Sequence, residues 1–272
     1  MNTINLPFKS FWSTILAWTF GSAEGGVINR QAISQTCKNT NGIDLIEEAI
    51  RAYYNSDYQK SFSILMKNPE LVQANADALF ILANMYMFGN GISKNVKAAI
   101  ELYFKATELG CKDAMYNIGV SYLKGIGHKK NYEMGISWIQ KAAEKGEEKS
   151  MLFIANQCQD EGRLSEAKGW LERLASYGNP QGMYQLAVMY LNGISGQVNY
   201  AYSLALLNKV IDREITDTSL KPIQKSLNLL GIMHAQGLGV RIDVHKAVVY
   251  LKLSYQLGDK TASSLLKKWA VL

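Results

Sequence analysis

The sequence is poor in residues that characterise several common protein classes. It holds four prolines and three cysteines in 272 residues, so neither a proline-rich linker nor a dense disulfide framework organises it. Histidine is equally scarce, and His128, His234 and His245 lack the spacing of metal ligands. We therefore expect no metal site and no cofactor.

Charged residues are also few, at 19% of the chain, and the formal net charge is +6. The basic residues are scattered along the chain, and they gather only in doublets such as Lys129-Lys130 and Lys267-Lys268. Nucleic-acid binding proteins usually carry a basic stripe with interleaved aromatic residues, and no such stripe is present. The charge therefore excludes nucleic acid as the expected partner and mildly favours an acidic protein.

What the sequence does contain is a short motif that recurs. The motif occupies residues Asn84–Ile92, Gly119–Gly127, Ala187–Ile194 and Gly231–Val240. Self-similarity at a regular period predicts stacked structural units that share one core, and such stacks usually bind other molecules rather than transform them.

The first clear unit, residues 77–110, predicts two antiparallel helices. Apolar residues at helical spacing give each helix one buried face. Gly89 and Gly91 end the first helix, because glycine adopts the left-handed conformation at little cost, and Asn95 caps the second. Equivalent caps are expected at Asn131, Asn199 and Asp243. Buried large side chains are expected at Tyr86, Tyr122, Tyr190 and His234, opposite small ones at Ala83, Gly119, Ala187 and Gly231.

Outside this unit the pattern predicts the following organisation. Residues 1–23 are a signal peptide or an N-terminal helix, and residues 24–42 are irregular. Residues 43–75 form a degenerate helix pair, with helices at about 43–54 and 58–66. Residues 76–258 hold five units, with Cys158 as a buried core residue of the third and an insertion near 212–225 that is either an extended helix pair or a loop. Residues 259–272 form a closing helix.

The apolar run Phe11–Phe20 bears on the location of the protein. Lys9 precedes the run and the small residues Gly21-Ser22-Ala23 follow it, which is the layout of a secretory signal with a short apolar region. The run is too short to span a bilayer as a helix. We favour the signal, which predicts a periplasmic or secreted protein. The alternative, a helix that caps the stack, leaves the protein in the cytoplasm.

The repeated residues resemble those of the Sel-one-like repeat (SLR) family, a relative of the tetratricopeptide repeat. The second unit carries the resemblance most fully, at Ala114, Gly119, Tyr122, Gly125, Gly127, Asn131, Trp138, Lys141, Ala142, Ala143 and Gly146. The resemblance covers residues 77–258. It implies an all-α fold, a right-handed α-solenoid of stacked antiparallel helix pairs, and a role as adaptor or scaffold.

In the related repeats the first helix of each pair lines the concave surface. Transferred to this sequence, the expected partner-binding positions are Phe80, Asn84, Met87, Tyr116, Val120, Leu123, Tyr184, Val188, Leu191, Asn228 and Ile232. Most of these residues are apolar. Either they pack against neighbouring first helices, or they form an exposed docking stripe of the kind that marks protein contacts.

No residue pattern marks a catalytic centre, so we expect a non-enzymatic scaffold that binds a protein partner. The Gly-x-Gly pairs lie between helices and lack the following lysine of a phosphate-binding loop. By analogy with bacterial members of the family, the leading hypothesis is an immunity protein that blocks a secreted antibacterial effector such as a lipase. The alternatives are an adaptor in an envelope or secretion complex, and a cell-wall-directed enzyme or small-molecule binder.

Overall fold

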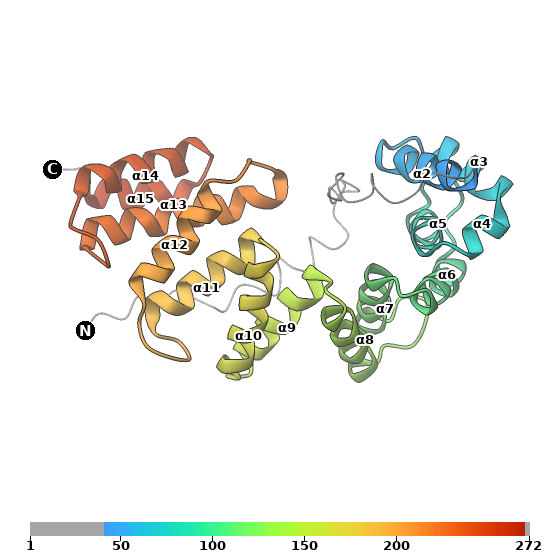
Figure 1. Cartoon of the computed structure of the whole chain (residues 1–272), viewed down its shortest axis with the longest axis horizontal. Helices are drawn as coiled ribbons and strands as arrows, with labels where there is room; N and C mark the ends of the chain where they lie inside the picture. Colours follow the sequence, from blue (N-terminus) through green and yellow to red (C-terminus); the bar gives the residue numbers. More distant parts are fainter. Residues whose placement is uncertain (1–40, 270–272) are drawn as a thin grey trace. The chain divides into compact units, whose positions relative to one another are not determined.

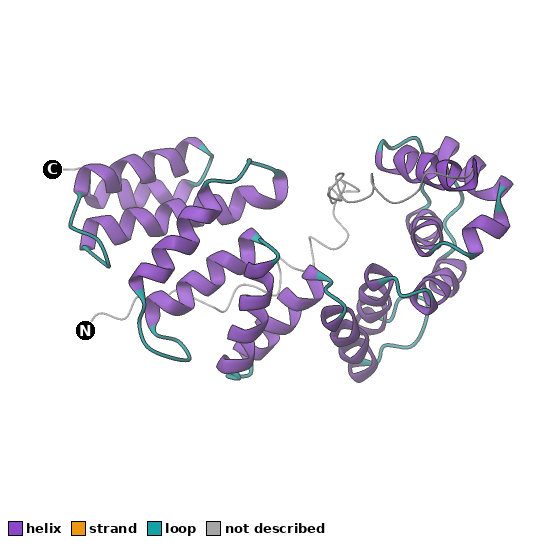
Figure 2. Cartoon of the chain, viewed as in Figure 1, coloured by secondary structure: helices purple, strands orange, loops and turns teal. Residues whose placement is uncertain are grey.

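The computed structural model describes residues 41–269, which form helices joined by turns and short loops (Figures 1 and 2). These residues divide into two compact units, 41–138 (unit 1) and 139–269 (unit 2). Within the described part no strand is present, which confirms the predicted all-α fold of paired helices. The apolar run Phe11–Phe20 and the rest of residues 1–40 lie outside the described residues.

Unit 1 begins with the helix pair that was predicted over residues 43–75. The two helices are α2 (Asn41–Tyr54) and α3 (Tyr58–Lys67), and the short α4 (Pro69–Gln73), which was not predicted, follows them. Next come α5 (Ala76–Phe88), α6 (Val96–Glu108), α7 (Lys112–Lys124) and α8 (Tyr132–Glu144), within which the unit boundary falls. Each helix from α5 to α8 corresponds to one half of a predicted repeat.

Unit 2 continues the same alternation. The first helices of its pairs are α9 (Glu148–Asp160), α11 (Pro180–Asn192) and α13 (Asp217–Gln236). They pack on the second helices α10 (Leu164–Ser176), α12 (Tyr200–Ile211) and α14 (Val244–Gln256), and α15 (Lys260–Trp269) packs on α14. The insertion near 212–225 is mostly helix, because α13 is 20 residues long and contains Pro222.

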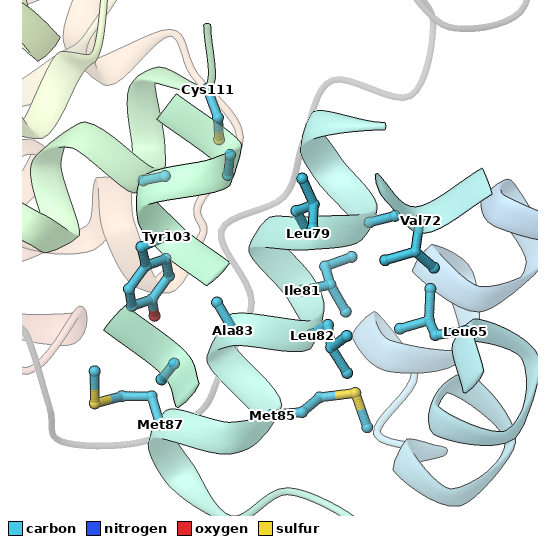
Figure 3. Close-up of a cluster of buried hydrophobic side chains, with 14 of the residues drawn as sticks. Leu65, Val72, Leu79, Ile81, Leu82, Ala83, Met85, Met87, Tyr103 and Cys111 are labelled. Carbon is cyan, nitrogen blue, oxygen red and sulfur yellow. The ribbon is translucent and has the colours of Figure 1, made fainter. Parts of the chain in front are cut away.

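The core of unit 1 centres on α5 (Figure 3). Eight of its 13 residues are buried, including Leu79, Ile81 and Met85, because α5 contacts α2, α3 and α4 as well as its partner α6. Tyr103 of α6, 1% exposed, is the largest fully buried side chain. A helix that is apolar on nearly every side is one that neighbours surround.

All four predicted caps are confirmed. The Oδ1 atom of Asn95 accepts a hydrogen bond from the backbone N–H of Ala98 at 3.1 Å, and Asp243 accepts from Lys246 at 2.8 Å. Asn131 and Asn199 make the same bond to the residue three positions later. Each cap satisfies a backbone donor that a helix start would otherwise leave unpaired, which contributes about 1 kcal/mol.

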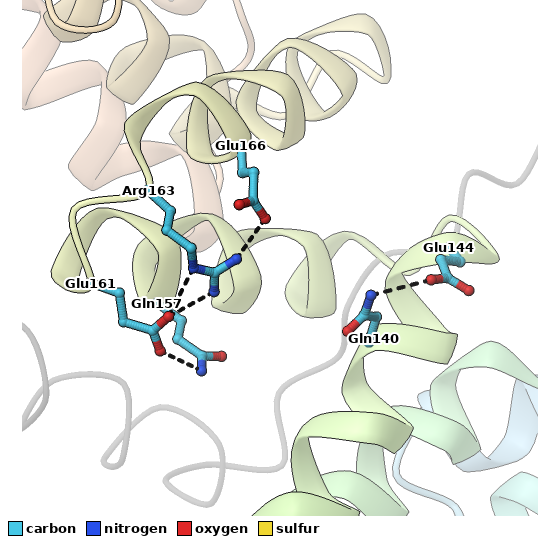
Figure 4. A network of polar contacts seen from close by, with 6 residues as sticks. All are labelled: Gln140, Glu144, Gln157, Glu161, Arg163 and Glu166. Carbon is cyan, nitrogen blue, oxygen red and sulfur yellow. Dashed lines mark hydrogen bonds and ion pairs between the residues drawn. The ribbon is translucent and has the colours of Figure 1, made fainter.

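The third repeat, where the sequence lacks the double glycine, turns more sharply than the others. Gly162 has a φ of +76° between α9 and α10. Arg163 closes the turn by pairing with Glu161, at 2.7 Å between its guanidinium and the carboxylate, and with Glu166 (Figure 4). All three side chains are exposed, so the pairs hold the turn geometry but contribute little to stability.

The burial predicted for the repeat tyrosines is wrong. Tyr86, Tyr122 and Tyr190 are half-buried, and two of them contact polar side chains. Tyr190 donates its hydroxyl to Glu172 at 3.1 Å, and the Tyr122 ring stacks on the His128 ring with centroids 3.8 Å apart. A tyrosine hydroxyl usually keeps a hydrogen-bond partner or water, which favours partial exposure of the side chain. The predictions for Cys158 and His234 are confirmed, since both are buried.

We expect His234 to make unit 2 less stable in mild acid. Burial and the nearby Lys246 lower the pKa of His234 below its usual 6.5, against the smaller opposing effect of Asp243. As the pH falls below about 6.5 the unfolded chain therefore takes up a proton that the folded chain resists, and the free energy of unfolding decreases. Substitution His234→Tyr, which introduces the residue that three of the other units have at this position, should reduce this loss.

The measurement is urea unfolding at pH 7.5 and 5.5, followed by circular dichroism, for the wild type and His234→Tyr. His245→Tyr serves as a control, because His245 is exposed on the following helix. The same decrease in stability in all three proteins would show that His234 does not cause it.

Candidate protein-interaction surface

The structure buries most of the side chains that were expected to bind a partner. Asn84, Met87, Tyr116, Val120, Val188, Leu191 and Asn228 are buried, whereas Phe80, Leu123, Tyr184 and Ile232 are half-buried. Phe80 packs on Tyr103, with ring centroids 5.9 Å apart, and Leu123 lies against Gly135 of α8. Their burial favours the alternative in which these residues pack within the chain, and partner binding by them stays a prediction.

A polar cluster joins the first helices of unit 1. Tyr103 donates its hydroxyl to Asn84 Oδ1 at 2.5 Å, and Asn117 Nδ2 of α7 lies 3.5 Å from the same oxygen. Burial raises the pKa of Tyr103, so this hydroxyl stays a donor at any physiological pH. The second helix of the pair, α6, thus supplies the hydroxyl of Tyr103 as a hydrogen-bond donor to the amide of Asn84 on the first helix, α5.

The equivalent cluster in unit 2 lacks this hydroxyl. Gln185 Nε2 of α11 donates to Asn156 Oδ1 of α9 at 3.0 Å. Leu171 precedes Gln185 by 14 residues, just as Tyr103 precedes Asn117, so a leucine stands where unit 1 has the tyrosine. Asn156 Nδ2 and Gln185 Oε1 are both buried and have no hydrogen-bond partner.

Tyr184, next to Gln185 on α11, contacts the following first helix, α13. The ammonium group of Lys225 lies 5.6 Å from the centre of the Tyr184 ring on α11, a distance at which a cation is attracted to an aromatic face. Burial raises the pKa of Tyr184 to about 12. Burial and the nearby positive charge of Lys221 lower the pKa of Lys225. Both side chains are therefore partly withdrawn from water.

Asn228, one turn beyond Lys225, links α13 to the start of α15. Its Nδ2 donates to Asp259 Oδ2 at 2.6 Å and to Thr261 Oγ1 at 3.2 Å, whereas its Oδ1 is buried without a partner. Successive first helices of unit 2 are thus connected side by side. We call the set that connects them the unit 2 ladder: Asn156, Tyr184, Gln185, Lys225 and Asn228.

Of the ladder, sequence reasoning found Tyr184 and Asn228 and missed the other three residues. The signal was present at two of them. Asn84 and Asn156 both stand two residues before the repeat tyrosine position, and Asn117 and Gln185 both stand five before it. Amides at matched positions of two neighbouring first helices predict a hydrogen bond between those helices. Lys225 carried no such signal, because its contact with Tyr184 depends on the length of α13.

The corresponding part of unit 1 carries the opposite charge. Asp77 of α5 lies near Asp113 of α7, and burial together with that neighbouring charge raises the pKa of Asp77. A depression of about 460 Å³ between α2 and α3 is lined by Glu48, Lys60 and other charged residues, and these two form an exposed ion pair at 2.8 Å. Where α13 of unit 2 carries Lys225, nine residues before His234, α5 of unit 1 thus carries Asp77, nine residues before Tyr86.

Residues 41–269 offer neither a metal cluster nor a membrane-spanning helix. No group of three or more histidine, cysteine, aspartate or glutamate side chains among them is arranged to hold a metal ion. None of their helices combines the length and the apolar character that a bilayer span requires. Cys111 and Cys158 are both buried free thiols.

Comparison with known proteins identifies the repeats. The family model described as Sel1 repeat matches residues 76–111, 112–147, 180–212 and 224–259, which together make up just over half of the chain. Comparison with curated proteins found no match. The helix pair α9–α10 falls between matched segments but follows the same architecture.

Solved structures show the same fold. A Sel1 repeat protein from Oxalobacter formigenes is 26% identical with a TM-score of 0.66, over 82% of this chain and 86% of that one. A protective antigen of uropathogenic Escherichia coli strains with an SLR fold is 20% identical with a TM-score of 0.54, over 83% of this chain and 56% of that one. With four matched repeats and helices paired as these proteins pair them, the chain belongs to the Sel1 repeat family.

Proposed function

We propose that this protein is a non-enzymatic scaffold and that the unit 2 ladder takes part in binding a protein partner. Sel1 repeats are a protein-interaction scaffold type, which supports the general role. The observation that carries the proposal is the set of three buried polar atoms without partners on three successive first helices: Asn156 Nδ2, Gln185 Oε1 and Asn228 Oδ1. Buried polar groups are nearly always paired with protein or with ordered water, and a bound partner is one source of the missing hydrogen bonds.

The chemistry of the ladder supports binding over catalysis. Asparagine and glutamine amides donate and accept hydrogen bonds but do not exchange protons at physiological pH. Tyr184, with a pKa of about 12, stays protonated, which makes it a poor general base. The amides and Tyr184 therefore orient and hold a partner rather than transform it.

The test is affinity capture with the tagged full-length chain from an extract of its host. We expect the wild type to retain a partner that Tyr184→Asp loses, because a charge replaces an aromatic contact of the ladder. Tyr255→Asp is the matched control, since Tyr255 is exposed on α14, a second helix. Circular dichroism confirms that all three proteins fold. Equal capture by the wild type and Tyr184→Asp would contradict a role of the ladder.

We further propose that the partner is a secreted antibacterial effector and that this protein is an immunity protein that occludes it. The predicted signal layout around Phe11–Phe20 and the resemblance to envelope members of the family support this finer function. Co-expression with the captured partner should protect cells from a toxicity that the partner causes alone. A partner that is not toxic would favour the alternative role, an adaptor in an envelope or secretion complex.

A further inference from the structure

The second helix of each repeat has two positions that stand six and ten residues after the residue that caps the helix. Side chains four residues apart lie on the same face of a helix. In α6 these positions hold Glu101 and Lys105, which are both exposed. In α12 they hold Ala205 and Lys209, which are exposed even though the pair α13–α14 follows. The second of the two positions is basic in four pairs: Lys105, Lys141, Arg173 and Lys209.

The last pair has apolar residues at both positions. On α14 they are Val249 and Leu253, which are 43% and 44% exposed, and Ile242, just before the capping Asp243, is 68% exposed. They stay exposed although both α13 and α15 contact α14. Since the same positions are exposed in α12, their exposure belongs to the repeat, and their apolar character is particular to α14. We call Ile242, Val249 and Leu253 the α14 stripe.

Positive charge is concentrated around this stripe. Residues 241–272 contain six lysines and arginines but two acidic residues, so this segment carries +4 of the net charge of +6, and α14 itself has no acidic residue. Lys246 and Lys252 stand three residues before and after Val249, and both are exposed. Residues three apart are neighbours on a helix, so the two lysines flank the stripe. Exposed apolar side chains flanked by cations complement the anionic, apolar-cored surface of a lipid bilayer.

The residue types favour a lipid surface over a protein partner for this face. Five of the six basic residues in this segment are lysines. Protein interfaces are depleted in lysine and enriched in arginine and aromatic residues, whereas the residues of the α14 stripe are aliphatic. A lysine stem can lie along apolar groups while its ammonium reaches a lipid headgroup. The combination of aliphatic residues with lysines is typical of helices that lie on membranes.

We propose that the α14 stripe docks unit 2 on the surface of a bilayer that contains anionic phospholipids. The helix α14 lies along the surface, with Val249 and Leu253 in the boundary between headgroups and acyl chains. Lys246 and Lys252 contact the lipid phosphates. The stripe is on a second helix and the unit 2 ladder is on first helices, so this inference goes beyond the proposed function and does not depend on it.

The experiment is flotation of the full-length protein with lipid vesicles. We expect the protein to float with vesicles of phosphatidylcholine and phosphatidylglycerol, and to bind pure phosphatidylcholine vesicles about tenfold or more weakly. Val249→Glu combined with Leu253→Lys tests the stripe. It installs the residues of α6, Glu101 and Lys105, as an ion pair four residues apart, and it leaves the net charge unchanged. Helicity should be preserved, whereas binding to the anionic vesicles should fall about tenfold.

A second pair of variants tests the lysines. Lys246→Glu combined with Lys252→Glu should weaken binding to the anionic vesicles about tenfold or more. Lys97→Glu combined with Lys105→Glu makes the same change of charge on the equivalent helix α6, where both lysines are exposed, and should bind as the wild type does.

Two results would overturn the inference. One is a wild type that does not float with the anionic vesicles, and the other is undiminished flotation of the Val249→Glu, Leu253→Lys variant. If the wild type does not float but this variant loses a protein that the wild type captures, the α14 stripe binds a protein and the assignment to a lipid surface is wrong.

Discussion

Gly239→Ala is expected to lower the free energy of unfolding of unit 2 by about 2–5 kcal/mol. Gly239 has a φ of +73°, a conformation that costs a residue with a side chain about 1–2 kcal/mol. A Cβ at this position would also lie 2.4 Å from Tyr200 Cβ at the start of α12. The clash cannot be relieved by a flexible side-chain end, because Tyr200 Cβ is fixed to the helix backbone, so overpacking adds a further 1–3 kcal/mol or so.

Gly162→Ala is the matched control for this substitution. Gly162 has nearly the same φ, +76°, and nothing lies within 4 Å of the position that a Cβ would take. It should therefore show the backbone cost alone, about 1–2 kcal/mol. Urea unfolding followed by circular dichroism measures both. Equal losses in the two variants would show that the second glycine of the Gly-x-Gly pair serves only its own conformation and makes no close contact with the preceding helix pair.

Local signals explain why so much of the fold could be predicted from the sequence. A capping residue such as Asn95 acts within three residues of itself, and a glycine such as Gly89 ends a helix through its own backbone. Both features can therefore be recognised in the sequence without knowing which other helices pack nearby. The region around Pro222 stayed undecided because proline disrupts most helices, and α13 nevertheless includes it.

The candidate site could be predicted only in part, because its properties depend on contacts between units. The residues of the first helices were found, but the sequence left open whether they are buried or exposed, and Tyr116, for example, is only 7% exposed. The ladder depends on Leu171 standing where Tyr103 does. The turn of the third repeat is four residues shorter than that of the first, so the equivalence of Leu171 and Tyr103 appears only when this difference is taken into account. The type of this one residue then decides whether the two amides have all their hydrogen-bond partners.

Gly231→Ala and Gly169→Ala should change stability in opposite directions, although both replace a glycine inside a helix of unit 2. In a helix, alanine is favoured over glycine by about 0.5–1 kcal/mol. Nothing lies within 4 Å of a Cβ at Gly169 on α10, so Gly169→Ala should raise the free energy of unfolding by that amount.

At Gly231 on α13 the same methyl group meets a packed helix. It would lie 2.8 Å from Leu251 Cγ and 3.2 Å from the carbonyl oxygen of Ala247, both on α14, and Leu251 is fully buried. Separating the two helices should cost about 1–3 kcal/mol, which exceeds the gain in helix propensity and lowers stability. Urea unfolding of the two variants decides the sign. If Gly231→Ala were as stabilising as Gly169→Ala, the small residues of the repeat would not be needed for the close approach of paired helices, and helix propensity alone would govern these positions.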